Sequence, residues 1–261
     1  MCGRFAVTTD PARLAAQIDA IDETGAGGLR SPNYNVAPTT DIAAAVARHD
    51  EPDDDPTRRL RLMRWGLVPS WVKAGPDGAP QTKSQLINAR AETVTTSPAF
   101  RASAEHKRCL IPMDGYYEWQ PNADNPKRGR KTPFYFSRQD GSPLLVAGLW
   151  SAWRSTPAGM SKTAGGSDRA AAPLLTCTVI TTDAVGDFAA VHDRMPLILA
   201  GRDWDRWLDP DAPAPADLLD APPDIAGLTM REVSTLVNST ANNGPELIEP
   251  AGPGNQPVGL F

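Results

Sequence analysis

The spacing of apolar residues along this chain predicts short helices separated by strands. Leu14, Ile18 and Ile21 recur at intervals of three to four residues after Asp10. This period places apolar side chains on one helical face. Asp10 can cap the helix because its carboxylate can accept hydrogen bonds from the first amides, and the proline that follows it is pre-set for the first helical turn. Two further short helices are expected, over residues 97–107 and 204–208.

Other segments have the apolar character of strands. Residues 109–119 and 174–182 predict two of them. Residues 132–136 and 144–150 flank Asp140-Gly141, a dipeptide typical of tight turns, and therefore predict a β-hairpin. Together these elements indicate one mixed α+β domain dominated by antiparallel strand pairing.

Composition favours a fold with many turns. Proline accounts for 26 of the 261 residues, which is about twice its usual share. The acidic, proline-interrupted residues 49–56 and the Ser-, Ala- and Gly-rich residues 154–172 are expected to be loop insertions within a domain that spans 2–261.

The overall charge leaves the class of partner open. The net charge is −5 and the isoelectric point about 5.2, whereas nucleic-acid-binding proteins are usually basic. Much of the acid lies in two blocks, residues 49–56 and 203–224, and several arginines lie outside them: Arg4, Arg64, Arg90, Arg101 and Arg108. An acidic chain is compatible with DNA if these arginines share one surface.

The apolar runs and the cysteines indicate a cytoplasmic location. The longest apolar run, Leu144–Trp150, is too short to cross a bilayer. Met1 leads into polar sequence with no hydrophobic signal region. Three cysteines without regular spacing indicate a reducing compartment. We therefore expect a soluble protein with no membrane partner, and nothing in the sequence requires more than a monomer.

Cys2 offers distinctive chemistry. Removal of Met1 would leave an N-terminal cysteine, whose amine has a pKa of about 7.7–8.0 and whose thiol has one near 8.5. An aldehyde can condense with such an amine to an imine, which the neighbouring thiol closes into a five-membered thiazolidine. The alternative is an ordinary second residue in a frayed terminus.

Three downstream segments supply candidate acids, bases and cations. Residues 87–93 are expected to be extended, which would place Asn88, Arg90 and Glu92 on one face. An extended chain would likewise place His192 and Arg194 on one side. Glu118 lies among aromatic residues, a setting that raises the pKa of a carboxyl group and suits it to acid–base work. The alternatives are an ion pair for Glu118 and a structural hydrogen-bonding role for His192.

Aromatic residues suggest a binding face. Residues 64–71 combine an arginine with Trp65 and Trp71, a mixture that single-stranded nucleic acid uses for stacking and backbone contact. The alternative places these indoles in the core. Cys109 and Cys177 lie in apolar strands and are expected to be buried. No cluster has metal-ligand spacing and no glycine-rich phosphate loop is present, so we expect neither metal nor cofactor.

The ordered set of motifs resembles the SRAP family, the SOS-response-associated peptidase or abasic-site-processing proteins. The resemblance extends from Cys2 to about Pro250. The motifs that carry it are Met1–Phe5 (MCGRF), 33–39 (NYNVAPT), 64–71 (RWGLVPSW), 88–93 (NARAET), 108–119 (RCLIPMDGYYEW), 147–150 (AGLW) and 192–196 (HDRMP).

The resemblance implies a fold, a chemistry and a set of roles. The fold would be one mixed domain with a curved antiparallel sheet and peripheral helices. The chemistry would be capture of the abasic-site aldehyde of single-stranded DNA as a thiazolidine crosslink, with self-processing that exposes the cysteine and an association with the nucleoid during DNA damage. Cys2 would be the nucleophile, Asn88 would position its amine, Glu118 would move protons and His192 would assist at the opened sugar. The residues expected to contact DNA are Arg4, Asn35, Pro38, Trp71, Arg90 and Arg194.

Two other functions remain open at this point. A thiol peptidase acting on proteins could use Cys2 as nucleophile with His192 or Glu118 as base. A non-catalytic single-stranded DNA-binding module would not need the thiol at all.

Overall fold

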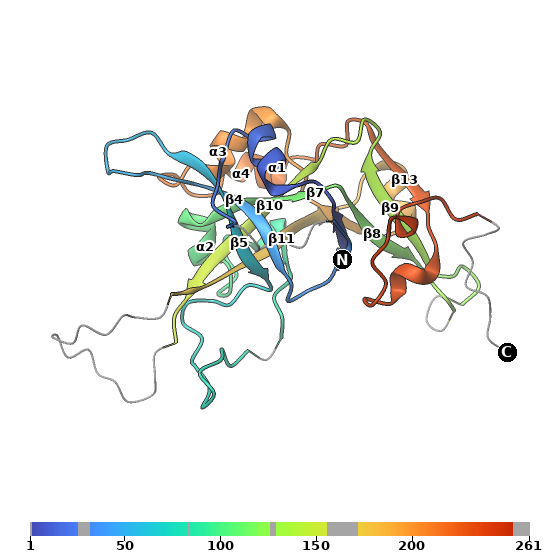
Figure 1. Ribbon diagram of the computed structural model, residues 1–261, viewed down its shortest axis with the longest axis horizontal. Helices are drawn as coiled ribbons and strands as arrows, with labels where there is room; N and C mark the ends of the chain where they lie inside the picture. Colours follow the sequence, from blue (N-terminus) through green and yellow to red (C-terminus); the bar gives the residue numbers. More distant parts are fainter. Residues whose placement is uncertain (1, 26–31, 83, 126–128, 156–171, 253–261) are drawn as a thin grey trace.

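The strands of the computed structural model form two sheets (Figure 1). The structure describes residues 2–25, 32–82, 84–125, 129–155 and 172–252. The smaller sheet is antiparallel, in the order β13-β9-β8-β1-β3. Its strands are β1 (Phe5–Val7), β3 (Asn33–Val36), β8 (Gly115–Gln120), β9 (Thr132–Arg138) and β13 (Leu228–Glu232).

The larger sheet has the order β12-β11-β10-β7-β4-β5-β2, and β6 pairs in parallel with β11. β11 also makes a short parallel pairing with β5, which lies further along the same sheet. This pairing closes a ring of five hydrogen-bonded strands: β5, β4, β7, β10 and β11. The strands are β2 (Ile21–Asp22), β4 (Asp41–Arg48), β5 (Thr57–Trp65), β6 (Asn88–Arg90), β7 (Arg108–Met113), β10 (Leu144–Trp153), β11 (Leu174–Asp183) and β12 (Arg194–Pro196).

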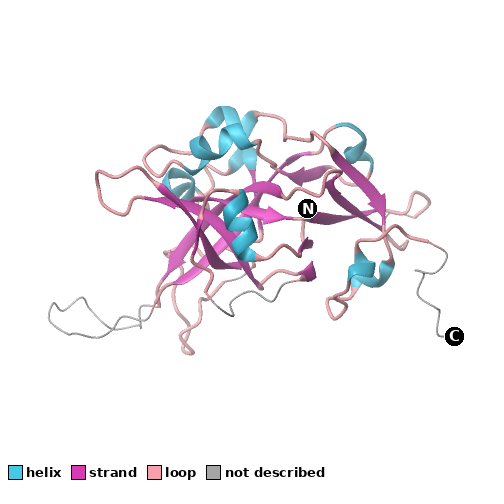
Figure 2. Ribbon diagram, turned by 45° about the horizontal axis from the view of Figure 1, so that its top comes forward, coloured by secondary structure: helices cyan, strands magenta, loops and turns pink. Residues whose placement is uncertain are grey.

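Short helices cover one face of the larger sheet, three of them at the top of Figure 1. The α-helices are α1 (Pro11–Gln17), α2 (Arg101–His106), α3 (Trp204–Leu208) and α4 (Ala216–Asp220). The 3₁₀ helices are η1 (Ala91–Thr93), η2 (Gly186–Ala190), η3 (Gly201–Asp203), η4 (Thr235–Asn238) and η5 (Pro245–Leu247). Figure 2 separates these helical segments from the strands by colour. None of the helices in the described ranges is long and apolar enough to cross a bilayer.

The opposite face of the larger sheet packs against the smaller sheet. Side chains at alternate positions of the larger sheet, such as Cys109 and Val179, meet Phe5, Tyr116 and Phe136 of the smaller sheet in one buried cluster. This intersheet core also contains Cys2. The nucleophile predicted from sequence therefore lies between the two sheets.

The predicted mixed α+β class with mainly antiparallel pairing is confirmed. The Asp10 cap is confirmed as well, because its carboxylate accepts a hydrogen bond from the Ala12 amide at 3.0 Å. The first helix is shorter than predicted, however. It ends at Gln17, Asp19 adopts a left-handed φ of 51°, and Ile21 lies in β2 with 48% of its surface exposed. The helix expected over 97–107 begins at Arg101, after a turn closed by the Phe100 amide on the Ser97 carbonyl.

Two strand predictions were wrong because the chain passes from one sheet to the other where a continuous strand or a hairpin was expected. The expected strand over 109–119 is divided at Asp114, where the chain passes from the larger sheet to the smaller one. The carboxylate of Asp114 accepts hydrogen bonds from the Thr8 amide at 2.5 Å and the Thr8 hydroxyl at 2.6 Å, which fixes this crossing. The hairpin expected around Asp140-Gly141 does not form either: β9 pairs with β8 and β13, whereas β10 pairs with β7 and β11.

The predicted insertions differ in what the structure shows of them. Residues 49–56 connect β4 to β5, and all but His49 are exposed. Residues 156–171 of the second segment lie outside the described residues.

Candidate active site and nucleic-acid interface

Cys2 is held in the intersheet core by the strand that follows it. Phe5 in β1 pairs with Tyr116 of β8 on one side and with Val36 of β3 on the other. Cys2 is completely buried, and its Sγ lies 4.0 Å from the Arg4 carbonyl oxygen. Burial raises the pKa of the Cys2 thiol far above its ordinary value, and the negative charge of Glu118 raises it further. The thiol is therefore neutral at physiological pH.

Asn88 contacts the backbone of Cys2 directly. It lies in β6, which pairs with β11 so that Asn88 is opposite Val179. Its Nδ2 donates a hydrogen bond of 2.8 Å to the Cys2 carbonyl oxygen. Its Oδ1 is buried and accepts no hydrogen bond from any described residue. The side chain thus holds residue 2 in place and retains one buried acceptor beside it.

Glu118 is a buried carboxyl group near Cys2. It is two residues beyond Tyr116 on β8, so both side chains leave the same face of the strand. Burial raises the pKa of Glu118, and the proximity of His192 opposes that rise only in part. A carboxyl group with a raised pKa can donate a proton nearer neutral pH than an ordinary glutamate.

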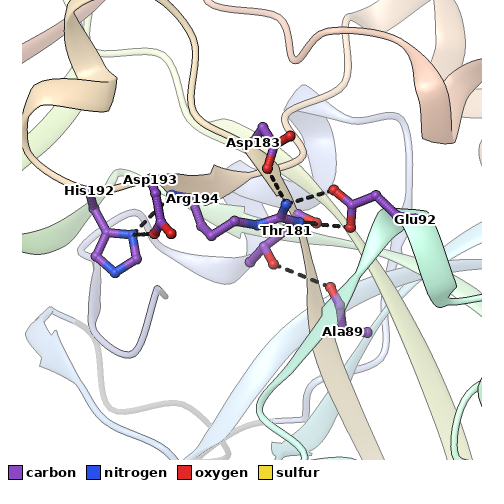
Figure 3. Close-up of polar contacts among 7 residues, drawn as sticks. All are labelled: Ala89, Glu92, Thr181, Asp183, His192, Asp193 and Arg194. Atoms are coloured by element: carbon purple, nitrogen blue, oxygen red, sulfur yellow. Dashed lines mark hydrogen bonds and ion pairs between the residues drawn. The ribbon is translucent and has the colours of Figure 1, made fainter.

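His192 is oriented through its Nδ1 (Figure 3). This atom lies 2.9 Å from Asp193 Oδ1 and accepts a hydrogen bond of 3.0 Å from the Arg194 amide. The hydrogen bond from the Arg194 amide therefore orients the His192 ring at the point where β12 begins.

Arg194 is anchored by acidic groups rather than exposed as a free cation. Figure 3 shows its guanidinium between Glu92 and Asp183, with Nη1 distances of 2.6 and 2.5 Å to their carboxylates. Its Nη2 donates to the Thr181 carbonyl at 2.6 Å. The hydrogen bond from Arg194 lowers the pKa of Glu92. The partnership of Glu92 was not foreseen, because β6 ends at Arg90 and Glu92 lies in η1 rather than in an extended chain.

Arg4 and Asn35 also make internal hydrogen bonds. Arg4 Nη1 donates to Asn35 Oδ1 at 2.7 Å and to the Val237 carbonyl at 3.0 Å. The amide of Asn35 donates to the carbonyls of Ser239 and Asn242, both at 2.9 Å. The two side chains therefore hold the segment that follows η4. Nothing in the local sequence of 235–242 indicated this partnership, because it joins residues about 200 positions apart.

The two tryptophans of the 64–71 motif have different environments. Trp65 is fully buried and its Nε1 donates to the Ile87 carbonyl at 2.9 Å. Trp71 is 67% exposed, the largest exposure of a large apolar side chain in the described residues. Arg90 is also exposed and Pro38 is half-buried. The core alternative therefore holds for Trp65, and the surface alternative holds for Trp71.

Arg108 cannot contribute to a basic surface. It is 3% exposed and its guanidinium donates only to backbone carbonyls, those of Ala104, Glu105, Trp207, Asp209 and Ala212. The structure thus removes one of the arginines counted from sequence as a candidate DNA ligand. The described part of the chain contains no group of three or more His, Cys, Asp or Glu side chains arranged to hold a metal ion.

The fold and the motifs define a family. Residues 1–240 match the family described as SOS response associated peptidase (SRAP). The chain belongs to this family. Among solved structures, it resembles a protein from Bacteroides thetaiotaomicron with a TM-score of 0.74 at 23% identity, over 96% of this chain and all of that one.

Curated relatives extend the resemblance along nearly the whole sequence. The chain is 37% identical over 251 residues to the abasic site processing protein YoqW of Bacillus subtilis, covering 95% of this chain and 99% of the relative. It is 38% identical to YoaM of the same organism, which carries the same description, with 95% and 98% covered. It is 30% identical to the abasic site processing protein HMCES of Gallus gallus, over 96% of this chain and 78% of that one.

Proposed function

We propose that this protein processes abasic sites in single-stranded DNA by capturing their aldehyde on Cys2. The observation that carries the proposal is the convergence of Asn88 and the buried Glu118 on residue 2. The relatives described as abasic site processing proteins support the choice of substrate. The proposal requires removal of Met1, which frees the amine of Cys2.

The proposed reaction joins one aldehyde to one cysteine with loss of one water. The Cys2 amine attacks the aldehyde carbon and gives a carbinolamine. As the carbon–nitrogen bond forms, one proton passes from the nitrogen to the oxygen. Glu118 then protonates the hydroxyl, which leaves as water and gives a protonated imine. The thiol attacks the imine carbon, and its proton passes to the Glu118 carboxylate as the carbon–sulfur bond forms. Because burial keeps the thiol neutral, the amine is the first nucleophile and the thiol closes the ring. In this scheme His192 assists at the opened sugar.

The proposed DNA contacts combine stacking with a small number of cationic groups. Trp71 offers an exposed indole for a base, Pro38 lies against the next base, and Arg90 is free to approach a phosphate. Arg4, Asn35 and Arg194 already hold parts of the protein, so in the proposal they shape the surface as well as contact the strand. With few free cations, affinity falls only modestly with salt.

A single-stranded oligonucleotide with one abasic site tests the proposed function. We expect a heat-stable band on a denaturing gel whose intact mass equals protein without Met1 plus DNA minus one water. An undamaged oligonucleotide and Cys2→Ala are the controls, and neither should give the band. Protein lacking Met1 that gives no adduct contradicts the proposal; peptide hydrolysis in trans would then indicate a thiol peptidase, and full function in Cys2→Ala a binding module.

Replacing Trp71 by alanine should weaken single-stranded DNA binding. Loss of one stacked base costs about 1–3 kcal/mol, which corresponds to an affinity roughly 5- to 150-fold lower. Fluorescence anisotropy at fixed salt measures it, with an oligonucleotide that carries a stable tetrahydrofuran in place of the lesion. Ile21→Ala is the matched control, because Ile21 is another exposed apolar side chain, on the edge strand β2. Equal affinity in both variants would exclude stacking on Trp71.

A further inference from the structure

Tyr116 has a buried hydroxyl group with no hydrogen-bond partner within the described part of the chain. A buried hydroxyl in this condition has lost its hydration without replacing it, which is unfavourable for folding. Such groups are uncommon in folded proteins and require an explanation. A ligand atom that arrives only when substrate binds would supply the missing partner.

Tyr116 lies in the same buried cluster as Cys2, whose amine and thiol are the proposed reacting groups. Its side chain leaves β8 on the same face as Glu118 and packs in the intersheet core with Cys2. The ring stacks on Phe136, with 4.6 Å between centroids and 9° between planes, which restricts its orientation. Phe5, three residues after Cys2, is its partner in the strand register. The hydroxyl is therefore held by packing on the side of the sheet that carries the site.

The phenol is suited to donate a hydrogen bond and keep its proton. Burial raises the pKa of Tyr116 well above its ordinary value, and the proximity of Cys2 and Glu118 raises it further. The group is therefore neutral throughout the physiological range. Near Cys2, the acceptor Asn88 Oδ1 and the donor hydroxyl of Tyr116 are both buried and make no hydrogen bond to any described residue.

We propose that the hydroxyl of Tyr116 donates a hydrogen bond to the aldehyde oxygen of the abasic site during attack by the Cys2 amine. This inference rests on the proposed function. Negative charge develops on that oxygen as the carbon–nitrogen bond forms, and a donor already in place stabilises it without reorganisation. The oxygen takes one proton from the attacking nitrogen and a second from Glu118, and it leaves as water while Tyr116 retains its own proton. The hydrogen bond exists only until the water departs.

The variant Tyr116→Phe tests this role because it removes one oxygen atom and keeps the ring stacking. Its expected effect is a capture rate about 2- to 13-fold slower, measured under single-turnover conditions on the abasic oligonucleotide, which is the range for one neutral hydrogen bond. Because the hydroxyl makes no hydrogen bond to any described residue, the melting temperature should be equal to or higher than that of the wild type. A purely structural tyrosine would show the opposite pattern.

Tyr117→Phe is the matched control on the same strand. The Tyr117 hydroxyl donates to the Tyr34 carbonyl at 2.7 Å, and its ring packs on the opposite face of the sheet with Val237 and Leu247. This variant should capture at the wild-type rate and melt at a lower temperature. A wild-type capture rate in Tyr116→Phe, or a lower melting temperature there, overturns the role of Tyr116 alone. Absence of capture by the wild type overturns the proposed function together with it.

Discussion

Replacing Glu118 by glutamine should slow aldehyde capture by at least about 100-fold, the lower range for loss of a general acid–base group. Glutamine keeps the size of the side chain but cannot supply the proton that the carbinolamine hydroxyl needs to leave as water. The rate is measured by quenching single-turnover reactions at timed intervals and resolving the crosslink on a denaturing gel. A variant within a factor of three of the wild type would remove Glu118 from the chemistry.

The pH dependence gives the same prediction an independent test. Because burial raises the pKa of Glu118, its protonated form persists above the pH at which an ordinary glutamate ionises. The capture rate of the wild type should include a limb that falls as pH rises through this raised pKa. The glutamine variant should lack that limb and keep the dependence on ionisation of the Cys2 amine.

Glu118→Gln should also stabilise the fold at neutral pH. The folded state holds the Glu118 proton more tightly than the unfolded chain, so folding stability falls as pH rises from about 4.5 through the raised pKa. Glutamine removes this loss, and the melting temperature of the variant should exceed that of the wild type by a margin that grows with pH in this window. A matched contrast is Glu92→Gln. Arg194 lowers the pKa of Glu92, so that its smaller stabilisation is present above pH 4.5 and is lost as pH falls through the lowered pKa.

Removing the Arg108 side chain should destabilise the protein by about 3–5 kcal/mol, the range for breaking a buried hydrogen-bonded charged group. Its Nε donates to the Trp207 carbonyl at 2.7 Å and its Nη1 to the Glu105 carbonyl at 2.7 Å. In Arg108→Ala these carbonyls and those of Asp209 and Ala212 lose the guanidinium as donor beside α3, whereas the Ala104 carbonyl keeps the Ala214 amide at 2.9 Å. Urea denaturation monitored by tryptophan fluorescence measures the change in the free energy of unfolding.

Two variants make the Arg108 prediction specific. Arg108→Lys keeps the charge but lacks the planar fork of donors, so it should recover only part of the stability. Arg101→Ala, on the exposed face of α2, should change stability by no more than about 0.5 kcal/mol. If Arg108→Ala is as mild as Arg101→Ala, the carbonyls that lose the guanidinium find other donors and the assignment fails.

Local chemistry determined which parts of the fold could be predicted. The Asp10 cap and the helix Trp204–Leu208 depend on residues a few positions apart, and both were predicted correctly. The hairpin at Asp140-Gly141 was wrong because a turn motif specifies a reversal of the chain but not the neighbour that each strand finds. Here β9 and β10 lie in different sheets. The crossing between the sheets at Asp114 likewise depends on Thr8, from a distant segment.

In the candidate site, too, the residues could be predicted from their types in the sequence, whereas burial and long-range contacts could not. Cys2, Asn88 and Glu118 were identified from residue types and from the family resemblance, and the structure brings them together. The behaviour of the arginines could not be predicted, because sequence gives a charge but not its burial. Arg108 donates to carbonyls, whereas Arg194 lies between two carboxylates. The hydroxyl of Tyr116 is another case, since only the three-dimensional packing shows that it is buried with no hydrogen-bond partner among the described residues.

The burial of Cys2 has a consequence for the timing of its maturation. β1 is an interior strand that pairs with both β3 and β8, and β8 is synthesised only when nearly half of the chain has been made. At ordinary ribosomal speeds this delay is on the order of ten seconds. Under the proposed function, removal of Met1 would take place in that interval, before β3 and β8 enclose β1. Translation rate and aminopeptidase supply, rather than DNA damage itself, would then determine what fraction of each newly made batch of protein is competent for capture.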